Sequence, residues 1–232
     1  MSSNIGFRIY KDFERPDPAL VEKFREIPTS NIGDMMNRMY CMHEYIRSIN
    51  KKNMSGVAFT VKVPAGDNLL LHYALDLAMP GDVIVVDAGS DLNRSVCGEI
   101  MFTYAQNRGI AGLVIDGSIR DSSGAKNLDI PIFAKGITPQ GPFKNGPGEI
   151  NVPIACGGQV VFPGDIIVGD PDGVVVIHKE DAPEVVELAI DKNQSEEVIL
   201  NHYAQGRLNR DEHFSEYHNL LLKKGVPIFK RA

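Results

Sequence analysis

The period of the hydrophobic pattern changes along the chain from helical to strand-like. Residues 18–26 and 29–39 carry apolar side chains at helical spacing, which predicts N-terminal helices within 18–39. Residues 55–63 alternate β-branched and aromatic residues with small or polar ones, which predicts a strand. A turn follows this strand and leads into a predicted helix at 68–78.

Short apolar runs alternate with amphipathic segments in the middle of the chain. The runs at 83–89 and 111–117 are typical of strands that are buried on both faces, and residues 98–109 between them predict an amphipathic helix. A short helix at 122–128 and a third strand at 130–136 continue the pattern. Because strands that alternate with helices pair in parallel, we expect a parallel β-α-β-α-β core here.

The pattern changes again in the last third of the chain. Glycine and proline interrupt it at 141–153, where we expect a shaped loop without regular structure. Residues 157–179 contain three short apolar runs, separated by Pro-Gly-Asp and Asp-Pro-Asp-Gly turns, which predicts added antiparallel strands. A charged helix is predicted at 180–205, and residues 206–232 form a polar tail that is too short to build a core. The predicted fold class is therefore α/β with a C-terminal helical extension.

Length and composition fit one domain better than two. The chain has 232 residues, 43% of them hydrophobic, which is enough to bury a full core. We expect residues 1–205 to form a single domain with its core at 55–179. A formal net charge of −6 and the lack of a basic stripe disfavour a nucleic-acid partner.

Several other classes of protein are disfavoured by what the sequence lacks. The first residues are polar and charged, and no stretch reaches the roughly 18 apolar residues of a membrane span, so we expect a cytoplasmic protein without a membrane partner. Cys41, Cys97 and Cys156 are far apart and form no CxxC pair, which disfavours a disulfide framework and a zinc site. The motifs of serine hydrolases, P-loop kinases, zinc proteases and nucleotide-binding dehydrogenases are also missing.

Polar residues gather where two of the predicted parallel strands end. After the first strand a helix opens near Gly98, and the free amides of residues 98–101 would face an anion above the carboxyl edge of the sheet. Arg120 and Asp121 directly follow the second strand, where they would bind a carboxylate substrate and a metal ion. The alternative is that Arg120 and Asp121 cap the next helix and pair with Glu99 on the surface.

The two strand ends resemble a known family. Glu99 lies in GDVIVVDAGSDLNRSVCGEI, and the Arg120-Asp121 pair lies in AGLVIDGSIRD. This pattern is similar to the signature of the RraA-like proteins and the HMG/CHA aldolases, which are class II pyruvate aldolases. The resemblance continues through PIFAKGITPQGPFKNGPGEINVPIACGG and PGDIIVGDPDGVVVI and covers about residues 30–180. Many family members have Asp at the position of Glu99.

The resemblance implies an assembly, a cofactor and a role for each polar residue. The implied fold is of the swivelling β/β/α type, in a homotrimer or a homohexamer (a dimer of trimers) with sites between subunits, and the implied cofactor is Mg²⁺ or Mn²⁺. Asp121 would be the direct metal ligand, Glu99 a carboxylate that acts on the metal through water, and Arg120 the contact to the C2 oxygen of the substrate. The substrate-binding set would be Gly98, Glu99, Ile100, Met101, Arg120, Asn68 and Lys144, and Glu196 or Glu197 would add a carboxylate from the adjacent subunit.

These roles imply a divalent-metal-dependent carbon–carbon lyase that acts on a small 2-oxo acid. Cleavage of 4-hydroxy-4-methyl-2-oxoglutarate or 4-carboxy-4-hydroxy-2-oxoadipate, and decarboxylation of oxaloacetate, would all proceed through a metal-stabilised enolate of pyruvate. The alternative is a non-catalytic RraA-type protein that binds and regulates ribonuclease E. The helix and tail after the last predicted strand favour the lyase, and the choice among the 2-oxo acids stays open.

Overall fold

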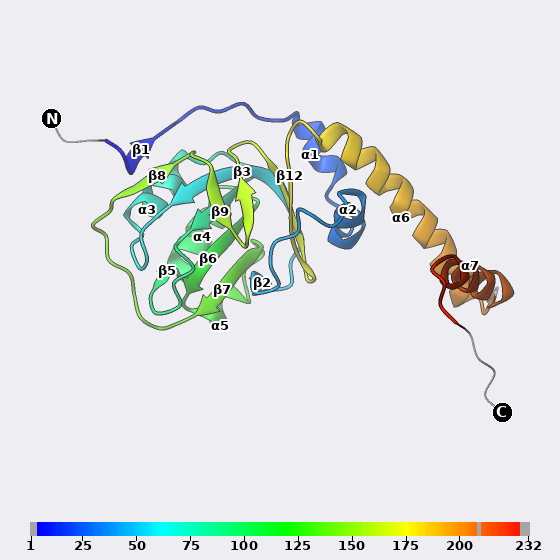
Figure 1. Cartoon of the computed structure of the whole chain (residues 1–232). Coiled ribbons are helices and arrows are strands. Elements are labelled where there is room, and N and C mark those ends of the chain that lie inside the picture. The colour runs from blue at the N-terminus through cyan, green and yellow to red at the C-terminus, as the bar shows by residue number, and fades with distance from the viewer. Residues whose placement is uncertain (1–3, 208–209, 228–232) are drawn as a thin grey trace. The chain divides into compact units, whose positions relative to one another are not determined.

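A central sheet brings together strands from most of the chain (Figure 1). The computed structural model describes residues 4–207 and 210–227. The chain divides into two compact units, Met1–Asp191 and Lys192–Ala232. The whole sheet belongs to the first unit, in the order β1-β8-β3-β4-β6-β7-β2.

The centre of this sheet is parallel, as the sequence pattern predicts. Its elements are β3 (Met54–Lys62), α3 (Leu69–Leu77), β4 (Asp82–Asp87), α4 (Glu99–Asn107), β6 (Gly112–Ile119), α5 (Ser122–Ala125) and β7 (Ile132–Ile137). Each strand from β3 through β4 and β6 to β7 runs parallel to the next. Ile84 and Val86 pack toward the helices, whereas Val83 and Val85 pack on the opposite face. The run 83–86 is apolar throughout because both faces of the sheet are covered.

Antiparallel strands extend the sheet, which confirms the prediction for residues 157–179. These strands are β9 (Ile154–Cys156), β10 (Gln159–Val161), β11 (Ile166–Asp170) and β12 (Gly173–Ile177). β11 pairs with both β3 and β12, and β9 and β10 form a separate two-stranded sheet. Ile154, Cys156 and Val161 of this small sheet cover the face of the parallel strands that carries Val83 and Val85.

The prediction of an irregular loop at 141–153 is wrong for its second half. Residues Gly148–Ile150 form β8, which pairs antiparallel with β3 and parallel with β1 (Phe7–Ile9). An added Cβ at Gly148 would lie 2.7 Å from the carbonyl oxygen of Lys62, so glycine lets the two strands approach. The short strands β1, β2 (Arg47–Ser48), β5 (Ser95–Cys97), β8 and β9 escape detection because two or three residues cannot show a period.

Helices precede and follow the strands along the chain. The predicted N-terminal helices are α1 (Pro18–Lys23) and α2 (Thr29–Met35), and the predicted charged helix is α6 (Ala182–Ala204). Val21, Ile32 and Val185 share a core cluster with residues of β11 and β12. The segment expected to be a polar tail contains a further helix, α7 (Arg210–Lys223). No helix among the described residues is long and apolar enough to span a membrane.

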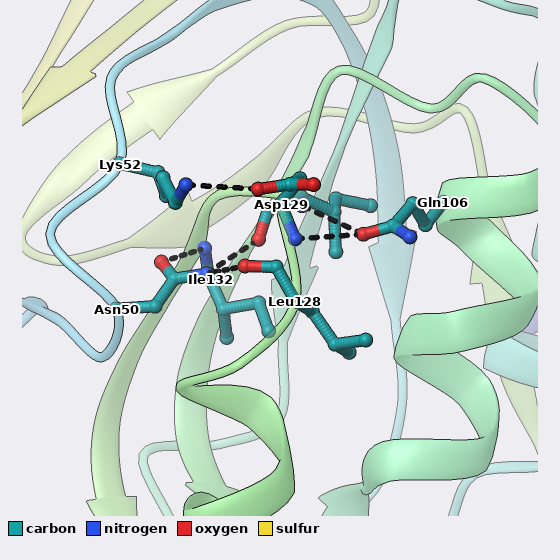
Figure 2. Close-up of polar contacts among 7 residues, drawn as sticks. Asn50, Lys52, Gln106, Leu128, Asp129 and Ile132 are labelled. Atoms are coloured by element: carbon teal, nitrogen blue, oxygen red, sulfur yellow. Dashed lines mark hydrogen bonds and ion pairs between the residues drawn. The ribbon is translucent and has the colours of Figure 1, made fainter.

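A set of polar contacts fixes the amino end of β7 to α4, at the far end of α4 from Gly98 (Figure 2). The side-chain oxygen of Gln106 accepts hydrogen bonds from the amides of Asp129 and Ile130, at 2.8 and 3.0 Å. From the other side, the Asn50 side chain donates to the carbonyl oxygens of Leu128 and Ile130 at 3.1 and 2.7 Å. Two side chains therefore satisfy the backbone of the turn that leads into β7.

Gln106 provides a test of this contact set. Gln106→Ala removes the acceptor of two amides, and we expect it to lower the free energy of unfolding by about 1–3 kcal/mol. Gln106→Glu keeps an acceptor oxygen in the same place and should stay within about 1 kcal/mol of the parent. Urea denaturation of the parent and the two variants measures both changes. Equal losses of unfolding free energy in the two variants would contradict a stabilising role for the acceptor oxygen of Gln106.

Candidate active site

A pocket of about 340 Å³ opens at the carboxyl edge of the parallel sheet. It is formed by the start of α3, by β5, by the start of α4, by the residues after β6 and by the loop at 141–144. Ligands of open α/β sheets bind at this edge because the connecting loops and helix N-termini lie there. The lining residues are Asn68, His72, Val96, Cys97, Gly98, Ile100, Met101, Arg120, Asp121, Gly141, Pro142 and Lys144.

The pairing of β5 with β6 brings the two predicted strand ends together. Cys97 lies opposite Ile119 in the parallel register, and the amide of Arg120 donates to the carbonyl oxygen of Cys97 at 2.9 Å. Gly98 follows Cys97 directly and occupies the N-cap position of α4. The start of α4 and the Arg120-Asp121 pair are therefore neighbours on one wall of the pocket.

Asp121 faces the start of α4. Its backbone is left-handed (φ 57°, ψ 38°) at the N-cap position of α5, but its side chain makes no capping hydrogen bond there. Instead, Oδ2 accepts from the amide of Glu99 at 3.2 Å and lies 3.4 Å from Nε of Arg120. Both side chains are 43% exposed. The alternative, in which Arg120 and Asp121 cap the helix and pair with Glu99, is met only in part: Asp121 makes no capping hydrogen bond, but it does contact the amide of Glu99.

Gly98 is packed closely against the side chains of Asp121 and Arg120. A Cβ at this position would lie 2.5 Å from Oδ2 of Asp121 and 2.9 Å from Cγ of Arg120. The backbone of Gly98 is extended (φ −153°, ψ −175°), a conformation that any residue adopts. Glycine is therefore needed here because there is no room for a Cβ, and not because of the backbone conformation.

The prediction of free amides at residues 98–101 is wrong for two of them. The Glu99 amide donates to Asp121, and the Met101 amide donates to the carbonyl oxygen of Gly98 at 3.0 Å. The Ile100 amide has no acceptor in the described part of the chain, so it stays available to an anion at the positive end of α4. Gly98 and Met101 are also lining residues of the pocket.

Among the site residues predicted to act within one subunit, Glu99 is the one that does not line the pocket. A Cβ added to Gly124 of α5 would lie 2.1 Å from Cδ of Glu99, so the carboxyl group packs over Gly124. The length of the Glu side chain allows this reach. Glu196 and Glu197 lie on α6 in the second unit, where Glu196 pairs with Lys192 at 2.6 Å and Glu197 accepts from Asn193 at 3.2 Å.

Asn68 lines the pocket and has a buried polar atom without a partner within the part of the chain that the structure describes. The residue is 3% exposed, and its Nδ2 donates to the carbonyl oxygen of Val96 at 2.9 Å. Its Oδ1 is buried and has no hydrogen-bond partner among the described residues. Buried acceptors of this kind are usually satisfied by water or by a ligand. The neighbouring Asp67 ties the loop to α3, because its carboxylate accepts from the amides of Leu69 and Asn145.

His72 and Cys97 line the pocket although the sequence pattern did not single them out. His72 lies one helical turn after Asn68 on α3, and this spacing is the signal that points to it. Burial lowers the pKa of His72, and the nearby charge of Lys144 lowers it further, against the opposing effect of Asp76. Burial raises the pKa of the Cys97 thiol, which therefore stays protonated and is a poor nucleophile.

Comparisons with known proteins identify relatives of this chain. Residues 29–176 match the model of the RraA-like family, described as Aldolase/RraA. A protein of Halalkalibacterium halodurans, provisionally named 4-hydroxy-4-methyl-2-oxoglutarate aldolase, is 43% identical over 179 residues, which are 77% of this chain and 85% of that protein.

Two solved structures resemble the fold closely. A protein from Pseudomonas syringae pv. tomato has a TM-score of 0.75 and 27% identity, over 84% of this chain and 96% of its own. RraAS2 of Streptomyces coelicolor, described as an unusual member of the RNase ES inhibitor RraA protein family, has a TM-score of 0.72 and 28% identity. That match covers 84% of this chain and the whole of RraAS2.

The fold and the pocket define an α/β protein with a pocket at the carboxyl edge of a parallel sheet, where charged and polar side chains are among the lining residues. The family model matches more than half of the residues, and the chain belongs to the RraA-like (Aldolase/RraA) family. The resemblance that was based on Glu99, Arg120 and Asp121 is thereby confirmed, as is the RraA-like fold.

A double-mutant cycle tests the packing of Gly98 against Asp121. Gly98→Ala should destabilise the protein by about 1–3 kcal/mol, because the added methyl group displaces two side chains. Asp121→Ala removes the nearest of them, so the two changes together should cost at least about 0.5 kcal/mol less than their sum. Gly98→Ala and Lys144→Ala serve as the control cycle and should be additive. Additivity in both cycles, measured by urea denaturation, would contradict the contact.

Proposed function

We propose that this protein is a divalent-metal-dependent carbon–carbon lyase that releases pyruvate from 4-hydroxy-2-oxo acids and from oxaloacetate. One observation carries the proposal: Arg120, Asp121, Asn68, Lys144 and the start of α4 line a single pocket. A guanidinium, an ammonium and an available helix amide suit a substrate with a carboxylate and an adjacent carbonyl oxygen. The name of the H. halodurans relative supports the same class of reaction.

The proposed tasks follow from the chemistry of each group. When the bond between C3 and the leaving carbon breaks, its electron pair moves toward the C2 oxygen and forms the enolate of pyruvate. Arg120 donates a charge-assisted hydrogen bond to that oxygen, where negative charge develops. The Ile100 amide and Lys144 bind the C1 carboxylate. Asn68 lines the same pocket and contributes to the shape of the substrate site.

Oxygen ligands at the pocket suit a hard divalent cation. The Asp121 carboxylate is partly exposed on the pocket wall, and we propose that it holds the ion directly. Glu99 does not line the pocket, so the role proposed for it is through water only. Among the residues that the structure describes, no group of three or more His, Cys, Asp or Glu side chains is arranged to hold a metal. Mg²⁺ does not need such a group, because it often keeps several waters and takes one or two carboxylates. Bound Mg²⁺ or Mn²⁺ would supply Lewis-acid polarisation of the 2-oxo group.

Metal removal tests the cofactor. Treatment with EDTA should abolish pyruvate release from oxaloacetate, and added Mg²⁺ or Mn²⁺ should restore it. Asp121→Ala should weaken Mn²⁺ binding at least about tenfold in calorimetry, since it removes the proposed direct ligand. Asp129→Ala, which changes an exposed acid paired with Lys52, is the matched control and should bind Mn²⁺ like the parent. Full turnover in verified metal-free protein would overturn the metal dependence.

Arg120→Lys separates a catalytic guanidinium from a surface charge. Lysine keeps the charge but loses the planar fork, so kcat should fall by roughly a hundredfold or more if Arg120 binds the developing oxyanion. The melting temperature and the Kd for Mn²⁺ should barely change. Arg108→Lys, at the other end of α4, is the control and should keep nearly parental kcat. Near-parental kcat in Arg120→Lys would refute the role assigned to Arg120.

We also propose a homotrimer or a dimer of trimers. Support comes from the second unit, in which large apolar side chains are exposed to solvent in the single chain, among them Val198, Leu200, Phe214 and Leu222. Light scattering should report at least three chains of 25.5 kDa at micromolar concentration. Leu222→Glu should shift the mass toward smaller species. A fully active monomer would contradict a site that needs a neighbouring subunit.

Binding to ribonuclease E is the second candidate function. It is favoured by the likeness to RraAS2, whose description names an RNase ES inhibitor family. A regulator of this kind would need neither a divalent metal nor the guanidinium of Arg120. Failure of the parent to release pyruvate from a panel of 2-oxo acids with Mg²⁺, together with binding and inhibition of purified ribonuclease E, would favour the regulator over the lyase.

A further inference from the structure

A second pocket of about 510 Å³, here called the distal pocket, adjoins the candidate active site. The two pockets share His72, Ile100 and Met101, so a molecule bound in the first can extend into the second. Residues four apart on a helix lie on one face, and two such pairs border the distal pocket. They are Leu69 and Tyr73 of α3, and Ile100 and Tyr104 of α4.

The surface of the distal pocket is mainly apolar and aromatic. Leu69, Tyr73, Ile100 and Tyr104 are all at least partly open to solvent, and the side chain of Ile100 is 81% exposed. An apolar group that enters the pocket would remove this surface from water, which stabilises the complex in proportion to the area buried. Exposed apolar surface next to a polar pocket commonly marks a binding site.

Charge in the distal pocket opposes an anionic occupant. Among the described residues that line it, Asp76 is the sole carboxylate, and no Lys or Arg is present. Oδ1 of Asp76 accepts a hydrogen bond from the Tyr104 hydroxyl. The pKa of His72 is lowered by burial and by Lys144, so the imidazole at the junction of the two pockets is mainly neutral near pH 7. Arg108, which donates to the carbonyl oxygen of Asp76 at 3.0 Å, and Lys144 lie outside this lining. A carboxylate in the pocket would therefore meet the charge of Asp76 with no cation among the lining residues to compensate it.

We propose that the distal pocket binds the leaving half of the substrate, and that the favoured 4-hydroxy-2-oxo acid carries an aliphatic or aromatic substituent on C4 in place of a further carboxylate. This inference rests on the proposed lyase function. It selects a substrate class that differs from the di- and tricarboxylic acids that the family resemblance implies. The pyruvyl half occupies the pocket of Arg120 and Asp121, and the C4 substituent lies between α3 and α4.

The reaction balances without an oxidant or a further reactant. The 4-hydroxyl group loses its proton to a base, the C4–O bond becomes a carbonyl, and the C3–C4 bond breaks. The electron pair of that bond forms the enolate of pyruvate, which takes up a proton at C3. The products are pyruvate and a neutral aldehyde, and the aldehyde is the group that the distal pocket would hold.

Two substrates with the same reacting core test the inference. Pyruvate release is measured with 4-hydroxy-2-oxo-4-phenylbutanoate and with 4-hydroxy-2-oxoglutarate, at saturating Mg²⁺, on the full-length protein. We expect kcat/KM to be about tenfold higher or more for the phenyl substrate, the size of effect that apolar pockets give. Oxaloacetate is the reference, because its leaving group is carbon dioxide and does not extend into the distal pocket.

Variants of the distal pocket complete the test. Tyr73→Ala should reduce the ratio of the two kcat/KM values about tenfold, and Tyr73→Arg should reduce it further by attracting the carboxylate. Leu69→Ala provides a second variant if Tyr73 variants fold poorly, and Tyr10→Ala, an exposed tyrosine outside both pockets, should leave the ratio unchanged.

The outcomes distinguish this inference from the proposed function. If the protein turns over oxaloacetate but prefers 4-hydroxy-2-oxoglutarate to the phenyl substrate, the role proposed for the distal pocket is wrong and the lyase function stands. The same holds if the ratio of the two kcat/KM values does not change in Tyr73→Ala and Leu69→Ala. If none of the three acids releases pyruvate, both the lyase function and the role proposed for the distal pocket are wrong.

Discussion

The parallel pairing of β5 with β6 is the interaction on which the candidate active site depends. β5 has three residues, yet it carries the chain from the loop after β4 to the first turn of α4. The hydrogen bond from the Arg120 amide to the Cys97 carbonyl oxygen joins one strand end to the other. Without it, the helix N-terminus and the Arg120-Asp121 pair would project separately from the sheet. The polar pocket therefore follows from backbone pairing before any side chain contributes.

Close packing then determines the chemistry of the pocket. Gly98 leaves room for the carboxylate of Asp121, and Gly124 leaves room for that of Glu99. The left-handed backbone of Asp121 directs its side chain toward the start of α4 and away from its own helix. Positive groups and a helix N-terminus surround one partly exposed carboxylate as a result. Such a set suits an anionic substrate and a divalent cation together, since each compensates the charge that would otherwise repel the other.

Much of this arrangement can be predicted from the sequence, because it depends on long repeating patterns. The central parallel strands are short, continuous apolar runs and α4 has a helical period. Arg120-Asp121 stands where a buried strand ends, so the edge that carries the site is predictable. The short strands, α7 and the contribution of His72 are harder to predict from the sequence, because they depend on pairing partners or on helix packing. The direction of the Glu99 side chain is also not encoded locally, since it depends on the space above Gly124.

The central claim is that this pocket stabilises the enolate of pyruvate, and hydrogen–deuterium exchange at C3 of pyruvate tests it most directly. Exchange needs enolate formation but no leaving group, so it does not depend on which 2-oxo acid is the substrate. Proton NMR of pyruvate in D₂O should show loss of the methyl signal with protein and Mg²⁺, and no loss beyond the buffer rate with EDTA or with the Asp121→Ala variant. Exchange at the buffer rate in the metal-loaded parent protein would contradict the account.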